Sequence, residues 1–187
     1  MSHLSTTFRI EATAAAVFDL IADPARSPEW QTLLADMGDI AGRPGGIGSS
    51  FVGYYKVAGR SLASRFVVTA AERPRLLQVN GTTSGGWARW TTMIEDRGTA
   101  CEVQVGLEYE LPGEIVGSLF GLLTGNRIER DFRRTYDNLK QLAETGTAAL
   151  PSISAYDGRR RPTPIASIAS FDPDEDAAES GGQLATS

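Results

Sequence analysis

The chain is poor in the residues that build disulfides and metal sites. Its 187 residues include one cysteine, Cys101, and one histidine, His3. A single cysteine excludes an intramolecular disulfide, and one cysteine with one histidine is a poor basis for a zinc site. We therefore expect neither a metal nor a cofactor.

The sequence also lacks a surplus of positive charge and any long hydrophobic run. Six acids and three arginines lie beyond residue 144, which leaves 17 acids and 15 bases in the first 144 residues. A region so close to neutral lacks the surplus of positive charge that is typical of nucleic-acid-binding proteins. No stretch reaches the ~20 apolar residues of a membrane span. The opening MSHLSTTFRIEATAAAVF has neither a basic leader nor a long apolar core, which predicts a cytoplasmic protein.

Composition changes near residue 145. Residues 146–187 are rich in Ser, Ala, Pro and Asp, so they are predicted to form a disordered tail with little to bury. Its stretch RRRPTPIAS fits either a kinase substrate or a plain solvated segment. Residues 1–145 are expected to form the folded, ligand-binding domain.

The pattern of the folded part predicts an α+β domain. HLSTTFRI alternates like a strand, and TAAAVFDLIAD follows as a helix with Thr13 as its N-cap. DPARSPEW offers Asp23 and Ser27 as caps, each followed by proline, so two short helices are expected after the first strand. Several alternating segments then precede a closing helix, and this order is typical of an antiparallel sheet packed on a helix. One face of that helix carries Ile128, Phe132, Tyr136, Leu139 and Ala143.

Hairpin arithmetic assigns strand residues to the two faces of the sheet. In a two-residue hairpin, opposed residues have a constant sum of positions and share a face. Turns at Gly59–Arg60, Ser84–Gly85 and Arg97–Gly98 agree in placing Trp90 on the inner face. Trp87, three positions away, then points outward. We expect Trp90 to be buried and Trp87 to be largely exposed.

The predicted inner face carries no charged side chain. Gly81 opposes Ala88 beside Trp90, where a filled core would place larger residues. This predicts a gap that opens into an apolar cavity beneath the closing helix. Alternatively, the small residues admit a closely packed helix or mark bulges where the sheet bends. The stretch GRPGGIG precedes a strand, so it predicts a flexible connection or a lid over one cavity mouth rather than a phosphate loop.

Three stretches resemble one known superfamily. FRIEATAAAVFDLIADPARSPEW, RGTACEVQVGLEYELPG and FRRTYDNLKQLAE are similar to the START-like (SRPBCC) proteins, which include polyketide cyclases/dehydrases and the birch-pollen allergen. The resemblance covers roughly residues 3–144. It implies a helix-grip fold, in which a curved antiparallel sheet of about seven strands wraps around the long C-terminal helix and encloses an apolar cavity.

Two classes of function stay open. Polyketide cyclases of this superfamily place ionisable groups in the cavity, whereas the inner face here offers hydroxyls and a thiol but no histidine base or carboxylate pair. We therefore expect binding of a hydrophobic small molecule such as a lipid, quinone, isoprenoid or polyketide, with no catalytic residue assigned. A cyclase/dehydratase-type enzyme is the alternative, and an interaction protein using Trp87 and the acidic tail is a third class. The candidate ligand-binding residues are Phe18, Trp30, Tyr55, Phe66, Gly81, Ala88, Trp90, Thr92, Val105, Leu107, Tyr109, Phe132 and Tyr136.

Overall fold

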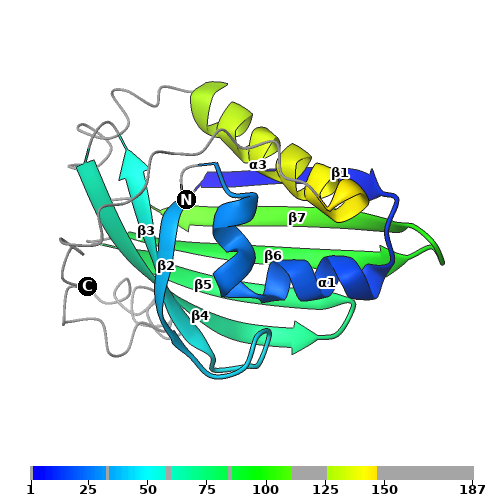
Figure 1. Cartoon of the computed structure of the whole chain (residues 1–187). Coiled ribbons are helices and arrows are strands. Elements are labelled where there is room, and N and C mark those ends of the chain that lie inside the picture. Colours follow the sequence, from blue (N-terminus) through cyan, green and yellow to red (C-terminus); the bar gives the residue numbers. More distant parts are fainter. Residues whose placement is uncertain (1, 33, 58–59, 84–85, 111–125, 147–187) are drawn as a thin grey trace, which may run out of the picture.

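One curved antiparallel sheet with helices on its concave face makes up the fold (Figure 1). The computed structural model describes residues 2–32, 34–57, 60–83, 86–110 and 126–146. The strands lie in the order β1-β7-β6-β5-β4-β3-β2. This confirms the expected α+β, helix-grip architecture with seven strands. The elements are β1 (Ser2–Ile10), α1 (Ala14–Ala22), η1 (Pro24–Glu29), β2 (Leu34–Ala41), β3 (Ser50–Val57), β4 (Arg60–Glu72), β5 (Leu76–Thr83), β6 (Gly86–Asp96), β7 (Cys101–Glu110) and α3 (Asn126–Thr145).

Two short helices connect β1 and β2, which lie at opposite edges of the sheet. Thr13 caps α1, since its hydroxyl accepts a hydrogen bond from Ala16 N at 3.3 Å. Asp23 caps η1 in the same way. The second cap, expected at Ser27, is wrong, because η1 is a single 3-10 helix that continues through Pro28. The carbonyl oxygen of Ser27 instead accepts hydrogen bonds from the backbone N–H groups of Trp30 and Gln31.

The sequence did not predict β2. Its pairing with β3 shifts register between Leu34 and Asp36 and again between Gly38 and Ala41. Asp39, inside the second irregularity, has a positive φ of 49°. Bulges break the alternation of two that identifies a strand from sequence, so β2 carried no readable signal.

The closing helix α3 lies across the concave face (Figure 1). Phe132, Tyr136 and Leu139 are buried, as predicted, and Ala143 is half-buried. The side chain of Ile128 lies outside the described residues, and so does the predicted tail beyond residue 146. Two long-range bonds fix the C-terminal end of α3. Lys140 Nζ donates to Arg9 O at 2.7 Å, and Glu11 N donates to Glu144 Oε1 at 2.8 Å.

Strand register agrees with the prediction in face but only partly in pairing. Gly81 opposes Ala88, as predicted. In the β6–β7 hairpin, however, Trp90 opposes Leu107, two residues from the predicted partner, because the chain turns over four residues rather than two. The β3–β4 hairpin turns one residue earlier than predicted and is displaced by two in the same way. A shift of two residues leaves every side chain on its face, so the inner-face assignment holds.

The two tryptophans point as predicted, but their exposure does not follow the prediction. The ring of Trp90 packs on the inner face, 5.6 Å from that of Phe66, and Trp87 lies on the outer face. Both are half-buried. Trp87 lies between Thr82 and Glu110 on the neighbouring strands. The inner face around Trp90 is only partly covered.

Candidate functional site

Aromatic side chains gather at the centre of the inner face. The ring of Phe66 is the hub, with centroids 5.2 Å from Phe51, 6.3 Å from Tyr55 and 5.6 Å from Trp90. These distances fall in the range of favourable aromatic packing. We call these four residues the sheet cluster.

A second aromatic group lies beneath α3. The ring of Tyr136 is its centre, with centroids 4.9 Å from Phe132, 5.8 Å from Phe8 and 6.1 Å from Trp30. Asn138 Nδ2 donates to the carbonyl of Trp30 at 3.2 Å, which ties the end of η1 to the helix. We call Phe8, Trp30, Phe132 and Tyr136 the helix cluster.

The gap predicted beside Gly81 is filled by Phe66, so that expectation is wrong. A Cβ built on Gly81 would lie 2.6 Å from Phe66 Cε1 and 3.0 Å from Trp90 Cζ3. On the other side of the ring, a Cβ on Gly53 would lie 3.0 Å from Phe66 Cε2. The two glycines therefore accommodate one aromatic ring between them. The predicted register placed Phe66 opposite Gly53 on β3, whereas Phe66 opposes Phe51 on β3 and Gly81 on β5.

Burial changes along the inner face. Towards one end, Val103 and Val105 are fully buried and Thr92 is 5% exposed. Towards the other end, several inner-face residues are only half-buried although they pack on the same core, whereas Phe66 and Gly81 among them are buried. These partly accessible residues, which we call the open end, are Phe51, Val79, Ala88, Trp90 and Tyr109. Away from the strand ends, where Asp96 pairs with Cys101, the described inner-face residues carry no charged side chain, so the accessible surface at the open end is apolar with a few hydroxyls.

Two tyrosines supply the polar groups between the clusters. Desolvation raises the pKa of the Tyr55 hydroxyl well above its usual value. Desolvation also raises the pKa of Tyr136, and the charge of an ionised Tyr55 would raise it further, which places the two phenols within electrostatic reach. Both are therefore neutral near pH 7. They can donate a hydrogen bond to a ligand oxygen but cannot act as bases there.

The indole of Trp30 adds a buried donor. Trp30 is 4% exposed, and its Nε1 has no hydrogen-bond partner within the part of the chain that the structure describes. A buried donor without an acceptor costs the folded state about 1–3 kcal/mol. The helix cluster thus tolerates an unpaired polar atom in apolar surroundings.

The thirteen residues predicted to bind ligand fall into five places. Tyr55, Phe66 and Trp90 belong to the sheet cluster, and Trp30, Phe132 and Tyr136 belong to the helix cluster. Gly81, Ala88 and Tyr109 follow one another across the sheet in the row of Phe66. Thr92, Val105 and Leu107 lie further along the inner face, and Phe18 is buried on α1.

Sequence reasoning left out two members of the aromatic clusters. Phe51 alternates with Gly53 and Tyr55 on the inner face, so the same alternation could have identified it. Phe8 lies on β1 opposite Val103, and its alternation with Ile10 carried the same signal.

The glycine-rich stretch before β3 is anchored rather than a free connection. Gly48 N donates to Val68 O at 2.8 Å, and Val68 N donates to Ser49 O at 2.9 Å. A Cβ on Gly45 would lie 3.0 Å from the Cβ of Ala22, so the stretch also packs against α1. The expectation of a flexible connection is therefore wrong.

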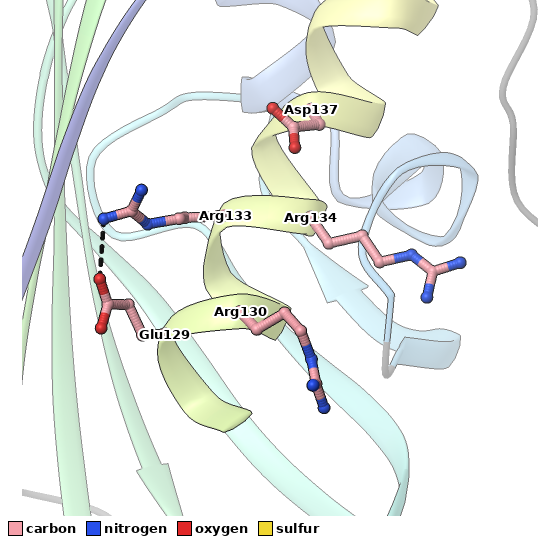
Figure 2. A pocket seen from close by; sticks show the side chains of 5 residues that line it. All are labelled: Glu129, Arg130, Arg133, Arg134 and Asp137. Atoms are coloured by element: carbon pink, nitrogen blue, oxygen red, sulfur yellow. Dashed lines mark hydrogen bonds and ion pairs between the residues drawn. The ribbon is translucent and has the colours of Figure 1, made fainter. Parts of the chain in front are cut away.

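A hollow of about 290 Å³ lies on the exposed side of α3 (Figure 2). One ion pair crosses its wall, in which Arg133 donates to Glu129 at 2.8 Å. Its charged, exposed lining separates it from the apolar site on the other side of the helix. The lining residues are Glu129, Arg130, Arg133, Arg134 and Asp137.

Among the described residues there is neither a candidate metal cluster nor a candidate membrane-spanning helix. Over the described ranges, no group of three or more His, Cys, Asp or Glu side chains is placed to hold a metal ion. No helix in the same ranges has both the length and the apolar character that crossing a membrane requires.

Comparison with known proteins gives one family and many similar folds. The family model described as "Polyketide cyclase / dehydrase and lipid transport" matches residues 1–144. No curated protein matches the chain. Protein CV1439 from Chromobacterium violaceum has a TM-score of 0.59 at 11% identity, over 77% of this chain and 99% of its own. A START superfamily protein from Mycobacterium smegmatis has a TM-score of 0.52 at 18% identity, over 72% and 97%. The di-domain ARO/CYC StfQ, from the steffimycin biosynthetic pathway, has a TM-score of 0.57 at 18% identity, over 76% of this chain and 45% of its own.

Proposed function

The chain belongs to the polyketide cyclase/dehydrase and lipid-transport family, and on that basis we propose that it binds a hydrophobic small molecule between the sheet and α3. A lipid, quinone, isoprenoid or polyketide fits this site. Binding would serve transport or sequestration of such a molecule.

The open end of the inner face carries this proposal. Apolar side chains that pack on a protein's own core are normally shielded from water, yet Val79, Ala88 and Trp90 stay partly accessible. An accessible, concave and uncharged surface with a few convergent hydroxyls is the usual composition of a small-molecule site. The hydroxyls of Tyr55 and Tyr136 would then orient a ligand by donating hydrogen bonds to its oxygen atoms.

Two measurements on the whole protein test this function. Organic extracts of the purified protein should contain an apolar compound that mass spectrometry detects and that a mock purification lacks. Addition of N-phenyl-1-naphthylamine, a neutral apolar fluorophore, should raise its emission and quench tryptophan emission as it binds near Trp90. A protein that yields no compound and leaves the fluorophore unchanged would contradict ligand binding.

A matched pair of variants locates the site. Ala88→Leu adds methylenes to the open end and should weaken fluorophore binding at least several-fold, while burial at about 0.8 kcal/mol per CH₂ offsets strain. Gln104→Leu places the same leucine side chain on the exposed outer face of β7 and should leave binding unaltered. Equal affinities for the two variants would show that the fluorophore binds elsewhere.

A cyclase/dehydratase-type enzyme is the second candidate, and the Tyr55–Tyr136 pair is the observation that favours it. Two neutral phenols within electrostatic reach of each other could hydrogen-bond a ketone oxygen and stabilise the enolate that forms during cyclisation. Incubation of the protein with an aromatic polyketide precursor should then give a cyclised product, and Tyr136→Phe should slow its formation. A precursor that binds and is recovered unchanged would leave binding as the function.

The cellular setting expected from the sequence belongs to the same proposal. We place the protein in the cytoplasm, which suits its lone, buried cysteine. The near-neutral first 144 residues support a partner other than nucleic acid.

A further inference from the structure

The strand β3 is buried on both of its faces. Phe51, Gly53 and Tyr55 point to the inner face, so the alternate residues Val52 and Tyr54 point outward. Yet Val52 is 6% exposed and Tyr54 is 2% exposed. A strand that is apolar on both faces is typical of a sheet covered on both sides.

No described helix lies on the outer face of β3. All of the described helices lie on the concave side (Figure 1). The flanking positions on this face are Asp36 and Gly38 of β2 and Ala63 and Arg65 of β4, which pair beside the strand rather than over it. Gly38 is buried as well, so the backbone of β2 beside Val52 is also shielded from water. We call Gly38, Val52 and Tyr54 the outer patch.

We propose that the C-terminal segment covers the outer patch, with its apolar residues 165–171 on Val52 and Tyr54 and the acids of residues 172–176 beside Arg65. Chain beyond Gly146 amounts to 41 residues, a reach of about 135 Å when extended. The end of α3 is fixed at β1, five strands from β3, which is about 24 Å at the usual strand spacing. The segment is therefore long enough to round the edge of the sheet.

The composition of residues 165–176, IASIASFDPDED, matches the surface that it would cover. Ile165, Ile168 and Phe171 recur every three residues and supply apolar groups for Val52 and Tyr54. Four acids follow Phe171 without an intervening base. Arg65, exposed and directly opposite Val52, supplies the complementary charge. This departs from the expectation of a disordered tail with little to bury.

A cysteine placed in the patch tests the contact. The native Cys101 is fully buried, so a second cysteine reports alone on its own surroundings. In the full chain, Val52→Cys should react with a thiol reagent at least ten-fold more slowly than the control Glu102→Cys, which lies on the exposed outer face of β7. In a chain ending at Gly146, the rate at Val52→Cys should rise at least ten-fold while the control rate stays constant.

A second variant keeps the test decisive if the shortened chain does not fold. In the full chain carrying Val52→Cys, the changes Ile168→Asp and Phe171→Asp should raise the thiol rate to the same extent. A rate at Val52→Cys equal to the control in the unaltered chain would overturn the contact. So would slow reaction that persists in the folded, shortened chain, because another segment or a second copy would then cover the patch.

Discussion

Replacing Gly81 by alanine should destabilise the protein although it adds only one methyl group. The new Cβ would lie 2.6 Å and 2.9 Å from two atoms of the Phe66 ring and 3.0 Å from Trp90 Cζ3. Contacts below 3.0 Å require the ring to shift. The rings of Phe51, Tyr55 and Trp90, with centroids 5.2, 6.3 and 5.6 Å from that of Phe66, leave it little room to do so. Overpacking of this kind typically costs about 1–3 kcal/mol.

Gly106→Ala provides a matched control for the same chemical change. Gly106 also lies within a strand, but the nearest atom to its added Cβ is His3 Nε2 at 3.8 Å, an ordinary contact. Loss of unfolded-state freedom should leave this variant neutral or about 0.4–1 kcal/mol more stable. Urea unfolding of both variants gives the comparison, since an unchanged slope means that the midpoint alone reports stability.

The double variant Gly81→Ala, Phe66→Leu identifies the cause. If the ring creates the clash, the two changes together should cost less than the sum of their separate effects, because the smaller side chain relieves the strain. A Gly81→Ala protein as stable as Gly106→Ala would refute the tight packing and restore the empty gap. Strict additivity in the double variant would remove Phe66 as the cause.

Three smaller perturbations test other contacts. Burial raises the pKa of Tyr136, so above pH 10 this phenol ionises in the unfolded chain before it does in the folded one. The free energy of unfolding should therefore fall there by up to about 1.4 kcal/mol per pH unit. Urea titrations between pH 10 and 11 should show a smaller fall for Tyr136→Phe. Thr13→Ala removes the α1 cap and should lower the free energy of unfolding by about 1 kcal/mol. An unchanged free energy would mean that water satisfies Ala16 N as well as the Thr13 hydroxyl does. The Arg73–Asp19 pair, 2.8 Å apart, is exposed and screened by water, so Arg73→Ala should cost little stability, and that small cost should shrink in 0.5 M salt. A cost that salt leaves unchanged would show that Arg73 stabilises the fold in another way.

Local patterns were enough to predict most of the fold. Alternation in β1 and β7, the cap at Thr13 and the apolar face of α3 each depend on neighbours within a few residues, so the sequence shows them directly. Inner and outer faces were also predictable, because a register error of two residues leaves them unchanged. β2 was missed for the converse reason, since its bulges remove the period on which recognition depends.

The sequence by itself determined that an uncharged, aromatic-rich inner face would meet one long amphipathic helix. Only the tertiary structure decided how the space between them is filled. Gly81 and Ala88 are small in the sequence, but whether small residues leave a gap depends on side chains from other strands, and the ring of Phe66 occupies that space. The approach of Tyr55 to Tyr136, 81 positions apart, and the burial of Val52 on the outer face depend in the same way on contacts between distant parts of the chain. Periodicity assigns a residue to a face, whereas packing across the sheet decides what that face touches.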